Sequence, residues 1–135
     1  MREKKPDLFR ALSLLKAARI RHDFCMGLVV SDESASTIVS EIYESFRMQG
    51  EALLIAEGKE SIGSESHTFV MNALIALRPS SQRPAQVLLN LKDIRNKMNY
   101  KGYIALAGEA TEAKDIATSL FNALESQIKT QVQKS

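Results

Sequence analysis

Residues 84–103 read PAQVLLNLKDIRNKMNYKGY, and this stretch decides the class of fold that the sequence predicts. Its apolar side chains recur three or four residues apart, as they do on one face of an α-helix: Val87, Leu91, Ile94 and Met98. Pro84 suits the first turn of a helix, where its missing N–H is not needed, and Gly102 interrupts the pattern. The stretch therefore predicts a helix from Pro84 to about Tyr100.

The same spacing predicts four more helices, so the expected fold is all-α. These run from Asp7 to Met26, from the Ser31–Ser34 capping region to Gly58, from near Ser64 to Arg78, and from about Thr111. Strand signals are nearly absent, and only residues 103–107 could be extended. Because the connections are short, we expect an antiparallel up-and-down bundle of about five helices in a single domain, 1–135, with an ordered core of about 7–130.

Gly50 interrupts the apolar pattern of the second predicted helix. A glycine in a helix interior costs roughly 1 kcal/mol relative to alanine, so its presence needs a reason. Either a close contact with another helix or a local kink would supply one, and the sequence leaves both open.

Composition places the chain among ordinary globular proteins of the cytoplasm. Of its 135 residues, 44% are hydrophobic and 25% charged, and the net charge of +2 neither indicates nor excludes a nucleic-acid binder. Cys25 is the sole cysteine, so no intrachain disulfide can form, and its apolar neighbours predict a buried thiol. No apolar run approaches the ~20 residues that span a bilayer, so we expect no membrane association.

The sequence predicts neither a metal ion nor a cofactor. The loops hold too few glycines for a phosphate-binding loop or a dinucleotide fingerprint. His22 and His67 are too isolated for a zinc site. We expect His22 to lie near the end of the first helix and His67 in the first turn of the third, both in structural roles, although either could approach Arg95.

Arg95 is the residue that suggests a function. It falls at the edge of the apolar stripe, with Asn99 one turn further along, so its guanidinium could bind a phosphate at a helix interface. Three lysines add positive charge around this helix, and two tyrosines could hydrogen-bond or stack on a base: Lys92, Lys97, Lys101, Tyr100 and Tyr103. The alternative is a structural arginine paired with a carboxylate such as Glu44 or Glu51.

The run from Asp93 to Tyr103, DIRNKMNYKGY, resembles the signature region of HEPN domains (higher eukaryotes and prokaryotes nucleotide-binding). Their signature is an arginine, commonly followed by Asn, Asp or His, and a histidine four to six residues after the arginine. Arg95 and Asn96 match it. The segments 42–47, 51–54, 58 and 66–67 occur in a similar order, so the resemblance covers most of residues 8 to 130.

This resemblance implies a helical bundle that forms a homodimer, with the signature arginines near a shared cleft. In active members the arginine and histidine form a metal-independent ribonuclease site, in which the histidine moves protons and the arginine stabilises phosphate charge. Other members pair with a minimal nucleotidyltransferase in toxin–antitoxin systems, or act as binding modules without catalysis.

The sequence departs from the signature where the histidine is expected, because Tyr100 stands five residues after Arg95. A phenol with an ordinary pKa near 10 is a poor proton carrier at pH 7, although it can donate a hydrogen bond to phosphate. The preferred hypothesis is therefore a weakly catalytic or non-catalytic module that binds a nucleotide, RNA or a partner through five residues: Arg95, Asn96, Asn99, Tyr100 and Tyr103. The alternatives are a ribonuclease toxin that uses Arg95 with Tyr100, and a plain helical protein-interaction module.

Overall fold

The computed structural model describes residues 2–3, 5–60 and 66–134, and this part of the chain contains five helices and one short two-stranded ladder. The helices are α1 (Leu8–Met26), α2 (Ala35–Ala56), α3 (Ser66–Ala76), α4 (Val87–Lys101) and α5 (Ala107–Gln133). The ladder joins β1 (Arg2–Glu3) to β2 (Lys59–Glu60) in antiparallel register. The all-α prediction is confirmed, and the ladder is an addition that the sequence did not indicate.

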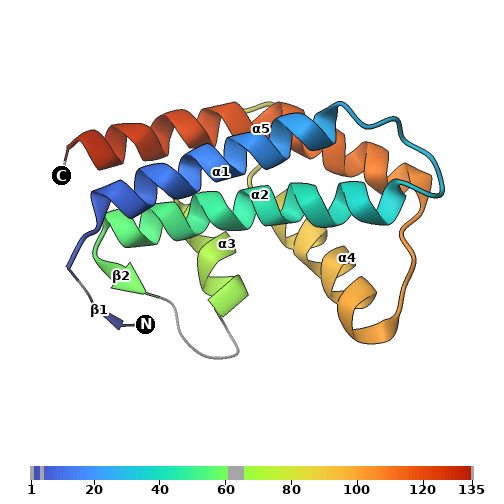
Figure 1. The fold of residues 1–135 in the computed structure, drawn as a ribbon, viewed down its shortest axis with the longest axis horizontal. Helices are drawn as coiled ribbons and strands as arrows, with labels where there is room; N and C mark the ends of the chain where they lie inside the picture. Colours follow the sequence, from blue (N-terminus) through green and yellow to red (C-terminus); the bar gives the residue numbers. More distant parts are fainter. Residues whose placement is uncertain (1, 4, 61–65, 135) are drawn as a thin grey trace.

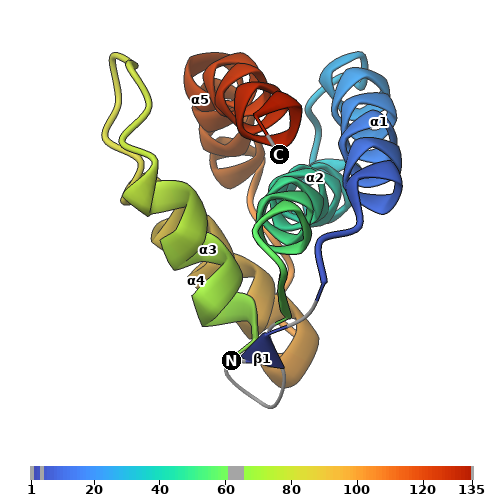
Figure 2. The ribbon, with the colours of Figure 1, turned by 90° about the vertical axis from the view of Figure 1, so that its left-hand side faces the viewer.

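The helices form two groups on either side of α2. In Figure 1, α1 and α2 run in opposite directions, and α5 passes behind α1 and runs in the same direction as α2. The shorter α3 and α4 lie together and cross the direction of α2 steeply. Figure 2 shows that α1 lies on one side of α2 and that α3 and α4 lie on the other. α1 and α2 are therefore antiparallel, as expected, whereas α2 and α5 are parallel.

The core surrounds α2, which packs against each of the other four helices. Its largest fully buried side chains come mainly from α2 and α5 and include Ile38, Ile42, Tyr43, Phe46, Leu53, Ile116, Leu120 and Phe121. Burial of a side chain of this size stabilises the fold by roughly 1.5–3 kcal/mol. α2 is therefore the central helix of the core, and the shorter helices α3 and α4 pack against it.

Most of the predicted helix ends are confirmed. Asp7 caps α1, because its Oδ1 accepts a hydrogen bond from the backbone N–H of Arg10 at 3.0 Å. Gly58 follows α2 with a φ of 73°, a left-handed conformation that glycine adopts without strain. α3 ends at Ala76, two residues before the predicted end at Arg78, which has a φ of 48° just before Pro79. The expected start of this helix near Ser64 lies outside the described residues.

The predicted boundaries of the last two helices were wrong by a few residues. Pro84 lies in a tight turn before α4, whose first bonds are of the i to i−3 kind, with the Val87 N–H 3.2 Å from the Pro84 oxygen. The last helix begins at Ala107 rather than Thr111, and its regular structure continues to Gln133. Its early start follows from Glu109, whose Oε1 accepts from the Leu106 N–H at 2.9 Å, which is the glutamate half of a capping box.

Gly50 marks a close contact between α2 and α3. A Cβ added at this position would lie 2.3 Å from Cγ1 and 2.9 Å from the backbone oxygen of Val70. Such distances are well inside van der Waals contact, so a side chain here would push α3 away. Of the two explanations that the sequence left open, the close helix contact is therefore the one observed.

Candidate functional site

Arg95 lies on α4 where that helix meets α2. Leu88 and Leu91 of α4 are buried, and Ile94 and Met98 pack against the core at its edge. Arg95 itself is partly buried beside them. The predicted position of Arg95, at the edge of the apolar stripe, is thus confirmed.

The guanidinium of Arg95 rests on an aromatic ring of α2. Its Cζ lies 5.3 Å from the centre of the Tyr43 ring, within the range of a cation–π contact. Tyr43 is fully buried, so the ring is a fixed platform. Tyr43 belongs to a segment that supports the family resemblance, but its sequence position alone gave no sign of this role.

Two asparagines of α4 orient the same guanidinium. With its amide oxygen turned toward Arg95, Asn99 accepts hydrogen bonds from Nη2 at 3.0 Å and from Nε at 3.1 Å. The opposite orientation would place the NH₂ group of Asn99 against guanidinium donors. Asn96 Oδ1 lies 3.5 Å from Nη1, at the limit of a hydrogen bond. Arg95, Asn96 and Asn99 therefore form one group, as the i, i+4 spacing predicted.

His67, in the first turn of α3, contacts the same tyrosine. Its Nδ1 lies 2.6 Å from the Tyr43 hydroxyl, and the two rings stack with centroids 5.9 Å apart and planes inclined by 11°. Arg95 and His67, which the sequence could not place relative to one another, thus meet at Tyr43. The site therefore joins side chains from three helices, α2, α3 and α4.

The protonation states in the site follow from burial and from nearby cations. Burial raises the pKa of Tyr43 to about 12, against the opposing influence of Arg95 and Arg47. Burial also lowers the pKa of His67, and the positive charges of Arg95 and Arg47 lower it further. At pH 7 the Tyr43 hydroxyl therefore keeps its proton and the imidazole is neutral. The direction of the hydrogen bond between them depends on which ring nitrogen of His67 carries the proton.

The nearby carboxylates are held by a different arginine. The Arg47 Nε lies 3.0 Å from both carboxylate oxygens of Glu44, and Nη1 pairs with Glu51. The hydrogen bonds from Arg47 lower the pKa of Glu44, which favours its charged form. Within the described residues Arg95 makes no salt bridge. The alternative pairing of Arg95 with Glu44 or Glu51 is therefore wrong. Both acids lie on α2 and pair with Arg47 of that helix.

The two tyrosines that follow Arg95 differ in environment. Tyr100 has 76% of its surface exposed. Tyr103 is engaged within the chain, because its hydroxyl donates to Glu109 Oε1 at 2.6 Å and the Nζ of Lys97 lies 4.6 Å from its ring centre. Tyr103 therefore helps to stabilise the start of α5, whereas the exposed Tyr100 ring can contact a ligand.

A second cation approaches the site from α4. Lys92 lies one turn before Arg95, so both side chains occupy the same face of the helix. The Lys92 Nζ is 3.5 Å from the hydroxyl oxygen of Thr68, the residue that follows His67 on α3. Two positive charges of α4 and a neutral imidazole of α3 therefore lie where these two helices meet.

The remaining sequence candidates have structural roles. His22 is buried on α1, where its ring stacks on Phe121 at 4.0 Å and its Nδ1 lies 2.8 Å from Asp23 Oδ1. Cys25 is fully buried, and burial raises the pKa of its thiol to about 11, which makes it unreactive. The predicted buried thiol is confirmed.

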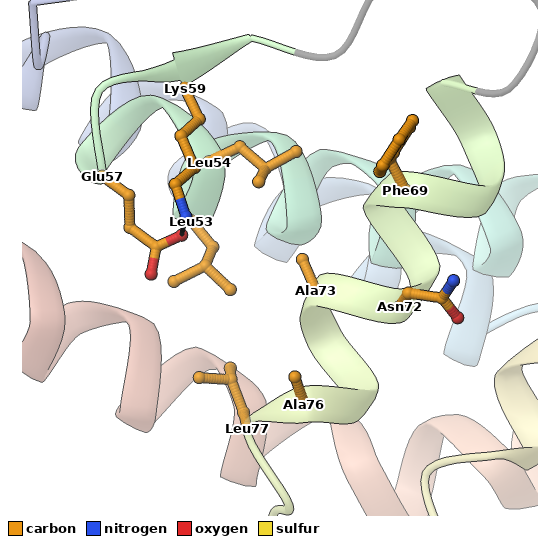
Figure 3. A pocket seen from close by; sticks show the side chains of 9 residues that line it. All are labelled: Leu53, Leu54, Glu57, Lys59, Phe69, Asn72, Ala73, Ala76 and Leu77. Atoms are coloured by element: carbon orange, nitrogen blue, oxygen red, sulfur yellow. Dashed lines mark ion pairs between the residues drawn. The ribbon is translucent and has the colours of Figure 1, made fainter. Parts of the chain in front are cut away.

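A shallow pocket of about 400 Å³ lies on α2 and α3, apart from the Arg95 site. Figure 3 shows leucine and alanine side chains along its walls, with Phe69 and Asn72 on α3 and the charged pair Glu57 and Lys59 at the end of α2. The Lys59 Nζ is 4.0 Å from Glu57 Oε1, which is a long, partly exposed ion pair. The pocket shares no lining residue with the Arg95 site.

Comparison with known proteins adds no assignment, since no protein-family model, curated protein or solved structure matches the chain. None of the described helices is long and apolar enough to cross a membrane. Among the described residues, no three His, Cys, Asp or Glu side chains converge as metal ligands would. The interpretation of the site therefore depends on its own geometry.

Proposed function

We propose that this protein is a HEPN-like cytoplasmic domain that binds the phosphate of a nucleotide or of RNA through Arg95. The observation that carries this proposal is a partly buried guanidinium that is fixed from two sides yet makes no salt bridge among the described residues. Tyr43 supports it from below, and Asn99 accepts from Nε and Nη2. Because this side chain is already held in place, it loses little conformational entropy when an anion binds, and this favours binding.

The donors that remain suit a phosphate group. A guanidinium has five N–H donors, and Asn99 uses only two of them, so donors on Nη1 and Nη2 remain for a bidentate contact. Lys92 can add a second charge from the preceding turn of α4. The exposed ring of Tyr100 offers a surface on which a base can stack. The HEPN-like ligand set is then Arg95, Asn96, Asn99 and Tyr100, with Tyr103 supporting the end of α4.

The proposal includes protein partners because the family resemblance implies them. A homodimer is the first, and a minimal nucleotidyltransferase of a toxin–antitoxin type system is the second. A binding role of this kind needs no proton transfer at position 100. It is therefore compatible with tyrosine in place of the signature histidine.

Equilibrium binding of a fluorescein-labelled single-stranded RNA, followed by anisotropy at fixed salt, tests the ligand. We expect Arg95→Ala to weaken binding roughly tenfold or more, because a charge-assisted phosphate contact contributes about 1.5–3 kcal/mol. Arg83→Ala is the matched control, since Arg83 pairs with Glu112 elsewhere on the surface. Equal affinities of wild type and Arg95→Ala, or no binding by wild type, would reject the proposal.

One observation favours a second candidate, a metal-independent endoribonuclease. His67 reaches Tyr43 from α3, so a histidine stands near Arg95 although the signature position holds Tyr100. A neutral imidazole can accept a proton, which Tyr100 cannot do readily at pH 7. Cleavage of RNA in the presence of EDTA that disappears in both Arg95→Ala and His67→Gln would establish this activity. Intact RNA after long incubation would leave the binding role as the better account.

A further inference from the structure

The outer face of α1 exposes an unusual amount of apolar surface. Among the described residues eight large hydrophobic side chains are exposed, and four of them lie on this helix: Phe9 (83%), Leu12 (48%), Ile20 (60%) and Phe24 (69%). The opposite face of α1 is buried in the core through residues that include Leu15, Ala18 and Cys25. The exposed residues therefore do not pack in the hydrophobic core of their own domain.

These side chains form one row along the helix, which we call the α1 stripe: Phe9, Leu12, Lys16, Ile20 and Phe24. From Leu12 to Phe24 the residues are four apart, which is the spacing of the ridges that pack between helices. Between Phe9 and Arg21, the neighbouring row of residues four apart contains the small side chains of Ser13 and Ala17. The large side chains of the stripe therefore lie beside a short stretch of small ones.

We infer that the α1 stripe is a self-association surface that binds the α1 stripe of a second copy of this chain. The stripe has nearly the same order of side chains in both directions, with a phenylalanine at each end, Leu12 and Ile20 inside, and Lys16 at the centre. A two-fold axis near Lys16 therefore sets Phe9 against the partner's Phe24 and Leu12 against the partner's Ile20. Such self-complementarity is what an isologous dimer requires.

The central lysine fits this arrangement. The stripe of one copy would pack against these small residues of the other, so the Lys16 stem would lie over the partner's Ser13 and Ala17, with its ammonium in water. The lysine weakens the contact without preventing it.

The size of the stripe predicts a weak dimer. From Phe9 to Phe24 the helix rises by roughly 22 Å. A fully buried aromatic side chain contributes about 150–250 Å², so the four exposed apolar residues offer roughly 500 Å² per copy. The pair would bury roughly 1,000 Å², the lower limit for a specific interface. Self-association should therefore depend on protein concentration.

This interface is independent of the proposed ligand site. Figure 2 shows α1 on the side of α2 away from α3 and α4, so a dimer formed through α1 leaves the Arg95 site of each copy open. It would form the proposed homodimer through α1 in place of the shared cleft of arginines that the family resemblance implies. Loss of the dimer should therefore leave RNA affinity unchanged.

Sedimentation velocity over a range of concentrations tests the inference. We expect wild type to dimerise reversibly, Ile20→Glu to be monomeric, and Lys16→Leu to dimerise at lower concentration because it removes the charge at the axis. The control is Ile104→Glu, which alters a residue with a similar exposed fraction, 73%, outside the stripe. A monomeric wild type, or equal effects of Ile20→Glu and Ile104→Glu, would overturn it.

Disulfide cross-linking tests the direction of the two helices. A mixture of Phe9→Cys and Phe24→Cys proteins should form a cross-linked heterodimer under mild oxidation, whereas either protein alone should cross-link poorly. The natural Cys25 is fully buried and contributes little background. Efficient cross-linking of each variant with itself, with none in the mixture, would contradict the antiparallel pairing.

Discussion

The Cζ of Arg95 lies 5.3 Å from the centre of the Tyr43 ring, so a cation on α4 rests on an aromatic platform buried in α2. The hydroxyl of that ring bonds to His67 on α3. Two residues that are 28 positions apart in the sequence are therefore linked through a third on another helix. This arrangement makes the electrostatics of Arg95 and His67 interdependent.

Removal of the Arg95 charge should raise the pKa of His67. Burial and the positive charges of Arg95 and Arg47 hold this pKa below its ordinary value of 6.5. In Arg95→Ala one of these charges is gone, so protonation of the imidazole becomes easier. An NMR titration of the His67 ring protons measures the change, with Arg83→Ala as the control. An unchanged or lower pKa in Arg95→Ala would show that the two groups do not interact.

Folding stability should fall as the pH is lowered through the region just below 6.5. The folded-state pKa of His67 is below 6.5, so in this window the unfolded chain binds more protons than the folded one. The free energy of unfolding therefore rises with pH across the window and levels off above it. The lowered pKa of Glu44 adds a separate loss only below its ordinary value of 4.5.

Urea unfolding of wild type and His67→Gln at several pH values measures this contribution. As the pH falls from 6.5 to the folded-state pKa of His67, the free energy of unfolding should decrease for wild type but not for the variant. At more acidic pH it should decrease for both proteins. A variant with the same profile as wild type throughout would assign the pH dependence to other groups.

Gly50→Ala should destabilise the fold although alanine is the better helix former. Its Cβ would lie 2.9 Å from the Val70 backbone oxygen, so α3 must move, at a cost of about 1–3 kcal/mol. Gly108→Ala on α5 is the matched control, because a Cβ there meets nothing within 4 Å. That substitution should stabilise by up to about 1 kcal/mol. Equal effects in urea unfolding would disprove the close contact.

Glu109→Ala should weaken the start of α5. The Glu109 carboxylate accepts from the Leu106 N–H and from the Tyr103 hydroxyl, so its loss leaves a helix N-terminus uncapped, at a cost of about 1 kcal/mol. Tyr103→Phe should also lower the melting temperature but leave RNA affinity nearly unchanged. A large loss of RNA affinity in Tyr103→Phe would instead place Tyr103 in direct contact with the ligand.

The sequence predicted the local features of this fold well because those features have local causes. The apolar spacing of each helix, the Asp7 cap and the stop at Gly58 all depend on neighbouring residues. The start of α5 was missed because it depends on Glu109, whose capping partner Leu106 is not a usual capping residue. The contact at Gly50 needed the position of Val70, which the sequence cannot supply.

The candidate site was predicted only in part for the same reason. Arg95, Asn96 and Asn99 lie within two turns of one helix, so their grouping follows from helical spacing. Tyr43 and His67 reach Arg95 from other helices, and a buried tyrosine and a first-turn histidine each have ordinary structural explanations. Pairing of Arg95 with Glu44 or Glu51 was a reasonable expectation, but Arg47 lies closer to both acids along α2.

The most direct test of the central claim is an NMR titration of the wild-type protein with a short single-stranded RNA, observing the arginine Nε–H signals and the histidine ring signals. The account predicts that the Arg95 Nε–H and the His67 ring shift first and saturate together, with the signals of Arg83 and His22 unchanged. Shifts centred on other arginines, with Arg95 and His67 unaffected, would contradict it.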